Sequence, residues 1–316
     1  MDLKKAYDSV WRNGLFFKLK KLGIDKKTTN IIENMYRQTS TSIIYKNQIL
    51  PTIQVTKGLK QGDNLSPILF NIYINDLPEN ISQGKTDPVY LLDQEVNCLL
   101  WADDLILLSR SPEGLQQCVR NLTDYCQKWK LEMNMKKTKV MTFNKSGKII
   151  KSIRIFANNT LLKNVKEYTY LGFTVTPSGT LTHGINNLID KAKRAWFSFK
   201  NIFYKSKSKN INTYTVLFDY VVKPILLYGC EIWGINLKTE DLAGIDKCSI
   251  EKFHLRVCKN ILGVHRGTSN IGTLAEIGRY PMACDIHKRM VRYLLRFNTQ
   301  SDTTLAVRAF RNKKKM

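Results

Sequence analysis

The spacing of apolar residues changes once along this chain, near residue 178. Before that point, stretches with helical spacing alternate with short apolar runs that predict strands. After Pro177-Ser178-Gly179 the spacing is helical throughout. The pattern predicts an α+β domain over residues 1–177, in which helices pack on an antiparallel sheet, and an all-α domain over residues 178–304. Residues 305–316 read as a basic tail.

Individual elements follow from the same pattern. Helices are expected at 13–22, 25–37, 68–77, 112–129, 185–203, 212–222, 224–233, 241–262 and 282–297. Strands are expected within 41–55, with a turn near Lys46-Asn47, at 96–100, 105–109 and 140–143, and within 153–176, with a turn at Asn158-Asn159. The helix at 25–37 should bury Ile31, Ile32, Met35 and Tyr36, and the polar segment 78–95 reads as a loop.

Two adjacent acids separate the apolar runs 96–100 and 105–109. Asp103 and Asp104 therefore lie at the tip of a predicted β-hairpin. Neighbouring carboxylates repel each other, and a divalent metal ion is the usual partner that offsets this repulsion. A solvated turn explains the same residues, because aspartate is common in turns.

The chain is strongly basic. It has 50 Lys and Arg against 26 Asp and Glu, a formal net charge of +24 over 316 residues. A surplus of this size favours nucleic acid as a partner. An anionic membrane would also attract it, but the sequence has neither a long apolar span nor a signal-like segment, so we expect an intracellular protein that is neither secreted nor bound to a membrane.

Cysteine chemistry contributes little to this picture. The seven cysteines stand mostly in apolar contexts and read as reduced core residues. Cys248, His254, Cys258 and His265 raise the possibility of a zinc site, but they lack a C-x-x-C pair and fall in a predicted helix, which argues against zinc.

Two further motifs precede the acidic pair. One is Asp2-Leu3-Lys4-Lys5-Ala6-Tyr7-Asp8, and the other is the segment 58–67, Gly-Leu-Lys-Gln-Gly-Asp-Asn-Leu-Ser-Pro. With Trp101-Ala102-Asp103-Asp104, Asn134-x-x-Lys137-Thr138 and Tyr170-Leu171-Gly172, in this order, the chain closely resembles the reverse transcriptases of non-LTR (LINE-type) retrotransposons. The resemblance extends to Leu227-Tyr228-Gly229-Cys230-Glu231-Ile232-Trp233-Gly234. The tryptophan departs from the family, which usually has Phe or Tyr before Ala-Asp-Asp.

The resemblance implies a right-hand polymerase fold, with residues 1–177 as the palm and 178–304 as a thumb-like domain. It implies that Asp2, Asp103 and Asp104 hold two Mg²⁺ ions, or Mn²⁺, for nucleotide addition to a primer 3′-hydroxyl. The motif starts at the second residue, so we expect the fingers of the family to be missing. The partners implied are an RNA template, a DNA primer or duplex and dNTPs; protein partners stay unknown.

The same resemblance assigns roles to other residues. Tyr7, Gln61, Gly62 and Lys137 would contact the nucleotide. By composition alone Tyr7 reads more often as a core residue, and the basic run around Lys137 reads equally well as solvated surface. Asp8 and Asp63 are expected to make structural hydrogen bonds. The family's primer grip falls on Tyr170, Leu171 and Gly172.

Lys191, Arg194 and Lys200 on a basic helix would contact duplex phosphates. The alternative interpretation is that this basic face of the helix is simply exposed to solvent. The function expected is RNA-directed DNA polymerase. A catalytically inactive nucleic-acid-binding remnant and an intron-type maturase are the alternatives. The family's work at chromosomal DNA suggests the nucleus.

Overall fold

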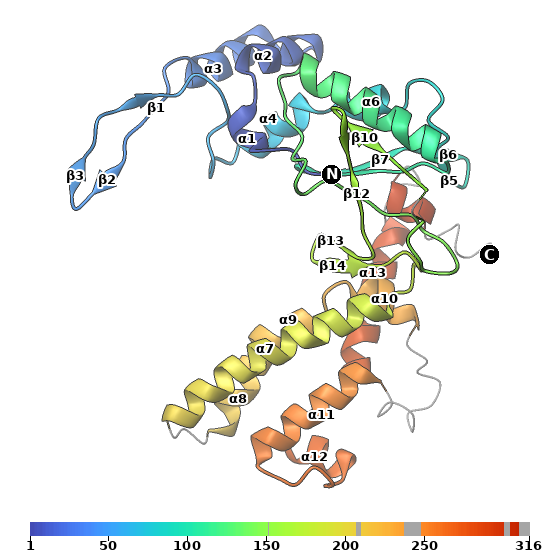
Figure 1. Cartoon of the computed structure of the whole chain (residues 1–316). Helices are drawn as coiled ribbons and strands as arrows, with labels where there is room; N and C mark the ends of the chain where they lie inside the picture. The colour runs from blue at the N-terminus through green and yellow to red at the C-terminus, as the bar shows by residue number, and fades with distance from the viewer. Residues whose placement is uncertain (151, 207–209, 237–247, 300–303, 310–316) are drawn as a thin grey trace. The chain divides into compact units, whose positions relative to one another are not determined.

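The computed structural model describes residues 1–150, 152–206, 210–236, 248–299 and 304–309 (Figure 1). The chain forms two compact units. The first comprises Met1–Val140 and Ile150–Val165, and the second comprises Met141–Ile149 and Lys166–Met316. Each unit has its own hydrophobic core. The basic tail expected at 305–316 is described only to residue 309, and 305–309 are helical.

The first unit mixes helices with small sheets. Its helices are α1 (Ala6–Ser9), α2 (Arg12–Lys21), α3 (Lys26–Arg37), α4 (Ser66–Tyr73), α5 (Leu77–Ile81) and α6 (Pro112–Lys128). Its strands are β1 (Ser40–Thr41), β2 (Ile44–Tyr45), β3 (Gln48–Ile49), β4 (Ile53–Gln54), β5 (Val89–Leu91), β6 (Gln94–Val96), β7 (Cys98–Trp101), β8 (Asp104–Leu107), β9 (Lys139–Val140), β10 (Phe156–Ala157), β11 (Thr160–Leu161) and β12 (Lys163–Asn164). The α+β class predicted from the sequence is confirmed.

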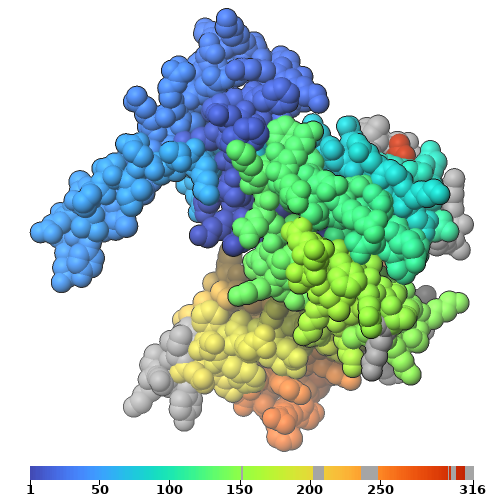
Figure 2. Space-filling model, turned by 45° about the horizontal axis from the view of Figure 1, so that its top comes forward, coloured from blue at the N-terminus to red at the C-terminus, as the bar shows by residue number. Residues whose placement is uncertain are grey.

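The strands pair two by two rather than in one continuous sheet. Among the described residues the pairs of this unit are β1–β4, β2–β3, β5–β6, β7–β8, β10–β11 and β9–β12. All are antiparallel except β9–β12, which is parallel. The β2–β3 hairpin turns at Lys46 and Asn47, both with positive φ, as expected, and it extends away from the helices as an arm (Figures 1 and 2).

Helix α6 contributes several side chains to the core of this unit. Ser111 caps its first turn by accepting a hydrogen bond from the Gly114 backbone nitrogen at 3.2 Å. One face buries the predicted apolar stripe, which includes Cys118, Leu122 and Tyr125. The 3.6-residue spacing of this stripe is the reason that the sequence predicted the helix closely.

Two expectations for this unit are wrong. The segment 78–95, expected to be a loop, contains most of α5 and the β5–β6 hairpin. It was read as a loop because strands of three residues leave too short a pattern to recognise. Of the four apolar residues expected to be buried in α3, Ile32 and Tyr36 are buried, whereas Ile31 and Met35 are 52% and 40% exposed. The helix contacts the rest of the unit along a narrower stripe than its apolar residues suggest.

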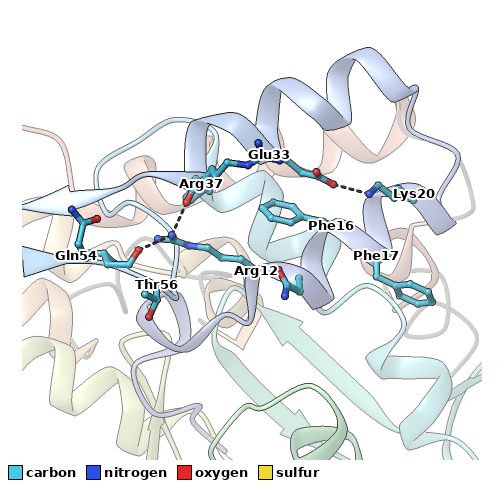
Figure 3. A pocket seen from close by; sticks show the side chains of 11 residues that line it. Arg12, Phe16, Phe17, Lys20, Glu33, Arg37, Gln54 and Thr56 are labelled. Atoms are coloured by element: carbon cyan, nitrogen blue, oxygen red, sulfur yellow. Dashed lines mark hydrogen bonds and ion pairs between the residues drawn. The ribbon is translucent and has the colours of Figure 1, made fainter.

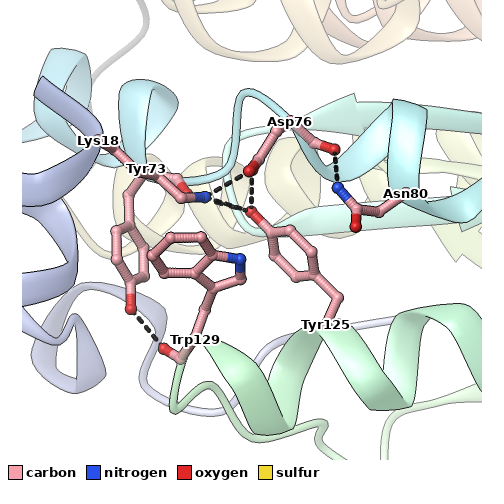
Figure 4. A network of polar contacts seen from close by, with 6 residues as sticks. All are labelled: Lys18, Tyr73, Asp76, Asn80, Tyr125 and Trp129. Atoms are coloured by element: carbon pink, nitrogen blue, oxygen red, sulfur yellow. Dashed lines mark hydrogen bonds and ion pairs between the residues drawn. The ribbon is translucent and has the colours of Figure 1, made fainter. Parts of the chain in front are cut away.

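A buried lysine ties α2 to α4 and α6 (Figure 4). Lys18 Nζ donates to Asp76 Oδ1 at 2.5 Å and to Tyr125 Oη at 2.7 Å, and lies 3.7 Å from the Trp129 ring centroid. Burial lowers the pKa of Lys18 and raises that of Tyr73 to about 12. Burial opposes ionisation of Asp76, but hydrogen bonds from Lys18 and Tyr125 outweigh it, so the pKa of Asp76 is lowered.

The second unit is mainly helical. Its only strands among the described residues are β13 (Tyr168–Tyr170) and β14 (Phe173–Val175), which form an antiparallel hairpin. The helices are α7 (Thr182–Ser206), α8 (Ile211–Leu217), the π-helix η1 (Phe218–Val222), α9 (Lys223–Leu226), α10 (Cys230–Trp233), the 3₁₀-helix η2 (Gly234–Asn236), α11 (Ser249–Leu262), α12 (Asn270–Glu276) and α13 (Met282–Thr299). The helical character predicted beyond residue 178 is confirmed where the structure describes it. Of the helix expected at 241–262, residues 241–247 lie outside the described residues and 249–262 form α11. The helix expected at 224–233 is divided into α9 and α10, with Gly229 in a left-handed conformation between them, and α12 was not expected.

The core of the second unit is built on aromatic side chains. Trp196 from α7, Phe218 from η1 and Trp233 from α10 are each almost completely buried. None of the described helices combines the length and the apolar composition that crossing a bilayer requires.

Candidate active site

The acidic pair lies at the tip of a hairpin, as the sequence predicts. Strands β7 and β8 pair antiparallel from Cys98 and Leu107 to Trp101 and Asp104, which leaves Ala102 and Asp103 as the two turn residues. Ala102 has a φ of 52°, a left-handed value that favours glycine. The side chain of Trp101 is 66% exposed beside the acids. A non-glycine residue in this conformation stores local strain next to the acids.

The segment that contains Asp2 pairs with this hairpin. Asp2 forms an antiparallel bridge with Asp104, and Leu3 forms one with Met133. Hydrogen bonds on both sides hold the segment: Leu105 N donates to Met1 O at 3.1 Å, and Asn134 N donates to Asp2 O at 2.8 Å. Because residues directly opposite in an antiparallel pair project to one face, the side chains of Asp2 and Asp104 share a face.

The Asp2 carboxylate is held by two polar side chains. Its Oδ2 accepts a hydrogen bond from Asn134 Nδ2 at 2.9 Å and lies 3.2 Å from Lys137 Nζ. The side chain of Asp2 is 11% exposed, while that of Lys137 is 69% exposed. The sequence identified Asn134 only as part of a motif. Its contact with Asp2 joins positions 132 residues apart, so local patterns gave no sign of it.

These acids supply oxygen donors of the kind that Mg²⁺ prefers. Asp2 and Asp104 are brought together, whereas Asp103 occupies the turn and makes no hydrogen bond or ion pair with a described residue. No group of three or more His, Cys, Asp or Glu side chains is arranged for a metal ion within the described ranges. The donor chemistry therefore fits a hard cation, with two acids assembled and the third beside them.

The other motifs of this unit meet around α1. Tyr7 stacks on Phe70 with ring centroids 4.8 Å apart, and its carbonyl accepts from Leu59 N at 2.8 Å. Gln61 Nε2 donates to Asp8 Oδ1 at 2.9 Å. Asp63 Oδ1 accepts from Leu65 N at 3.0 Å, so both Asp8 and Asp63 make the structural hydrogen bonds that the sequence suggested.

Glycine is required at one end of this loop by a close approach. Gly58 has a φ of +83°, and a Cβ at this position would lie 2.7 Å from Asp8 O. Gly62 has nearly the same φ, +86°, but open space around it. The first glycine therefore docks the loop on α1, and the second permits only a backbone conformation.

Arg12 fixes the same loop and was missed by the sequence analysis. Its Nη1 donates to Tyr36 O at 2.7 Å and to Val55 O at 2.8 Å (Figure 3). Its Nε donates to Gly58 O at 3.0 Å, and Nη2 donates to Lys57 O at 3.3 Å. Burial lowers the pKa of this guanidinium. An arginine at the start of an amphipathic helix usually faces solvent, so nothing local marks it as a backbone clamp.

In the second unit, the Tyr170-Leu171-Gly172 segment forms the β13–β14 turn. Leu171 and Gly172 both have positive φ. Tyr228 Oη donates to Leu171 O, and Lys191 Nζ donates to Gly172 O at 3.1 Å. The conformation of this turn is therefore fixed by side chains from α7 and from the loop after α9.

The three basic residues predicted to contact phosphates all lie on α7. At about 100° per residue, Lys191 and Arg194 are separated by about 60°, whereas Lys200 is about 180° from Lys191. The helix thus presents the first two on one side and the third on the other.

Of the residues considered for a zinc site, His254 lies buried on α11, where its Nδ1 is 2.9 Å from Glu251 Oε1.

Comparisons with known proteins match the region that contains these motifs. Residues 1–175, more than half of the chain, match the model of the family described as reverse transcriptase (RNA-dependent DNA polymerase). The chain is 24% identical over 250 residues to the RNA-directed DNA polymerase from mobile element jockey of Drosophila melanogaster, covering 76% of this chain and 26% of that protein.

Two Pol polyproteins from type-1 retrotransposable elements R2 are also similar. The Nasonia vitripennis protein is 31% identical over 177 residues, covering 54% of this chain and 16% of its own length. A Popillia japonica protein is 23% identical over 306 residues, covering 92% of this chain and 48% of its own length. The resemblance to non-LTR elements is confirmed, and the chain spans about a quarter of the jockey protein. From its motifs and from the match over residues 1–175, the chain belongs to the reverse transcriptase family.

Proposed function

We propose that this chain carries the catalytic part of an RNA-directed DNA polymerase of a non-LTR retrotransposon. Residues 1–177 would form the palm and 178–304 the thumb-like domain, with a basic tail at 305–316. The observation that carries the proposal is the bridge between Asp2 and Asp104, which places carboxylates from two motifs on one face. Lys137 already pairs with Asp2, and divalent ions would compensate the like charges that remain around Asp103 and Asp104.

Asp2, Asp103 and Asp104 would hold two Mg²⁺ ions, for which Mn²⁺ could substitute. When bound, the ions would activate the primer 3′-hydroxyl and neutralise charge on the α-phosphate and the leaving pyrophosphate. Asn134 keeps the Asp2 carboxylate in place through the hydrogen bond to Oδ2. Lys137, exposed and paired with the same oxygen, would neutralise this acid and hold a phosphate as a point charge.

The nucleotide would lie against the α1 region and the Gly58 loop. Tyr7, supported from behind by Phe70, would present its ring to the sugar and exclude a 2′-hydroxyl. Gln61 and Gly62 would contact the nucleotide and template from a loop that Arg12 and Gly58 anchor. The β13–β14 turn at Tyr170–Gly172 would grip the primer. Lys191 and Arg194, which share one side of α7, would contact duplex phosphates, whereas Lys200 lies on the opposite side and would not reach the same duplex.

The substrates proposed are an RNA template, a DNA primer and dNTPs. The net charge of +24 supports a polyanionic partner. Work on chromosomal DNA would place the protein in the nucleus.

Primer extension on poly(rA) with an oligo(dT) primer and Mg²⁺ tests this function. We expect Asp104→Asn and Asp2→Asn to reduce incorporation at least about 100-fold, because each removes a charged metal ligand. Asp124→Asn is the matched control, since Asp124 is exposed on α6 and makes no ion pair with a described residue. Equal incorporation by wild type and Asp104→Asn would refute the mechanism; RNA binding without any extension would favour the inactive remnant.

A further inference from the structure

A groove lies outside the proposed catalytic residues, on the first unit (Figure 3). It has a volume of about 610 Å³ and is bounded by α2, α3, the end of β4 and the two residues after it. Its lining residues are Arg12, Asn13, Phe16, Phe17, Lys20, Glu33, Tyr36, Arg37, Gln54, Val55 and Thr56. This volume is within the range of small-ligand sites, about 300–1,000 Å³.

The apolar part of the groove is aromatic. Phe16 is half-buried, and Phe17 is 59% exposed, although the two leucines of the same helix, Leu15 and Leu19, are fully buried. Tyr36 contributes from α3 and is buried. Phe16 and Phe17 are consecutive on α2 and point in different directions (Figure 3), so the more exposed ring, that of Phe17, offers a face of its own on which a planar group can stack.

Of the basic side chains that line the groove, Arg37 alone has no partner among the described residues. Arg12 is occupied by four backbone carbonyls, and Lys20 is paired with Glu33 at 2.7 Å. Arg37, which is exposed, forms no ion pair with any residue that the structure describes. Asn13 and Gln54 add exposed side-chain amides without a hydrogen bond to the described part of the chain.

The charge around Arg37 favours an anion. From residue 34 to residue 62 the sequence contains Arg37, Lys46, Lys57 and Lys60 but no Asp or Glu. A single free guanidinium suits one phosphodiester better than a triphosphate, which needs several donors. The amides can pair with the edge of a base, and the exposed ring of Phe17 can stack on its face.

We infer that this groove binds one unpaired nucleotide of a single-stranded nucleic acid, with the base on the exposed ring of Phe17 and its phosphate on Arg37. A base within a duplex is stacked on both faces and cannot enter, so the ligand is an unpaired segment. The site is separate from the proposed nucleotide-addition site, although its floor, Arg12, also anchors the Gly58 loop. The occupant would therefore contact the strand away from the reacting end.

Photo-crosslinking tests the site without metal ions or dNTPs, so its result does not depend on polymerase activity. Short oligomers carrying one 4-thiouridine (RNA) or 4-thiothymidine (DNA) are irradiated with the whole chain and digested with trypsin. Cleavage after Arg12 and Lys18 releases residues 13–18, which contain both groove phenylalanines. We expect crosslinks in this peptide, and the two oligomers distinguish RNA from DNA as the preferred strand.

Matched variants make the test specific. Phe17→Ala should reduce affinity at least about fivefold, the lower end expected for the loss of one stacking contact. The control Phe143→Ala removes a ring with the same 59% exposure from the other unit and should leave affinity unchanged. Arg37→Ala should weaken binding more than Arg120→Ala, which removes one charge from the exposed side of α6.

Thermal melting by circular dichroism checks that Phe17→Ala remains folded, because Phe17 also lies 6.4 Å from Trp129. Arg37→Ala changes an exposed residue and should not affect folding, so its loss of affinity tests the site even if Phe17→Ala is destabilised. Two outcomes overturn the inference: no crosslink in residues 13–18, or equal losses for Phe17→Ala and Phe143→Ala and for Arg37→Ala and Arg120→Ala. Either outcome would leave a protein segment as the remaining candidate ligand.

Discussion

Two glycines in one loop separate the effect of a close contact from that of backbone conformation. Gly58 and Gly62 have φ values of +83° and +86°, but only Gly58 approaches another backbone atom, Asp8 O. Replacing either by alanine places a side chain in the left-handed region, at a cost of about 1 kcal/mol. At Gly58 the added carbon also overlaps the Asp8 backbone, which cannot move without shifting α1.

We therefore expect Gly58→Ala to lower the free energy of unfolding by about 2–4 kcal/mol, and Gly62→Ala by only about 1 kcal/mol. Urea unfolding followed by tryptophan fluorescence measures both. If the two variants lose the same stability, the loop is not docked on α1 as described. A loss of nucleotide binding by Gly62→Ala with stability nearly intact would support its proposed contact.

Residues that hold the site were the least predictable from the sequence. Arg12 and Asn134 act on backbone or side-chain atoms that are 24 to 132 positions away, and no local period records such contacts. The position of Asp103 and Asp104 at a hairpin tip was predictable, because these acids stand between two apolar runs, which define a hairpin. Whether Asp103 joins Asp2 and Asp104 around metal ions stays a prediction.

At the scale of elements, long periodic segments were predicted well and short ones poorly. Helix α6 has a continuous stripe and a serine cap, and both its start and its buried face were expected. The β5–β6 hairpin has strands of three residues, and its turn is made by residues without a distinctive signature. Secondary structure of this length depends on tertiary contacts more than on propensity.

The contact between α2, α4 and α6 gives a pH-dependent prediction. Burial raises the pKa of Tyr73 to about 12 from an ordinary value near 10. Between pH 10 and pH 12 the unfolded chain therefore loses this proton while the folded chain keeps it, and stability falls as the pH rises. Below pH 10 both states are protonated, and the group causes no pH dependence.

We expect the free energy of unfolding to fall between pH 9 and pH 11.5, and Tyr73→Phe to remove about 1–2 kcal/mol of that fall. The phenylalanine variant also loses the hydrogen bond to Trp129 O, so it should be less stable at pH 9 while its pH profile is flatter. Tyr45→Phe, at a 60% exposed position of the β2–β3 arm, is the control. A Tyr73→Phe profile parallel to that of wild type would contradict the assignment.

At the scale of the whole molecule, the chain contains two separate cores. The first collects residues between Leu3 and Leu162, and the second collects residues between Leu188 and Ile286. The change in apolar period near residue 178 predicted a boundary there, whereas the compact units divide the chain differently, because 141–149 and 166–177 belong to the second unit. That assignment depends on contacts such as Asn144 N to Pro177 O, which no period encodes. The palm and thumb boundary stays a prediction.

Two cores predict two separable unfolding events. Leu122 in the first unit and Leu226 in the second are both completely buried, so Leu122→Ala and Leu226→Ala remove the same atoms from different cores. Each deletion should cost about 2–5 kcal/mol. In a unit of about 150 residues this lowers its melting temperature by roughly 5–15 °C. Differential scanning calorimetry should show each variant shifting one transition and leaving the other in place. A single transition that both variants shift equally would contradict this prediction, because it would mean that the two units unfold together as one cooperative system.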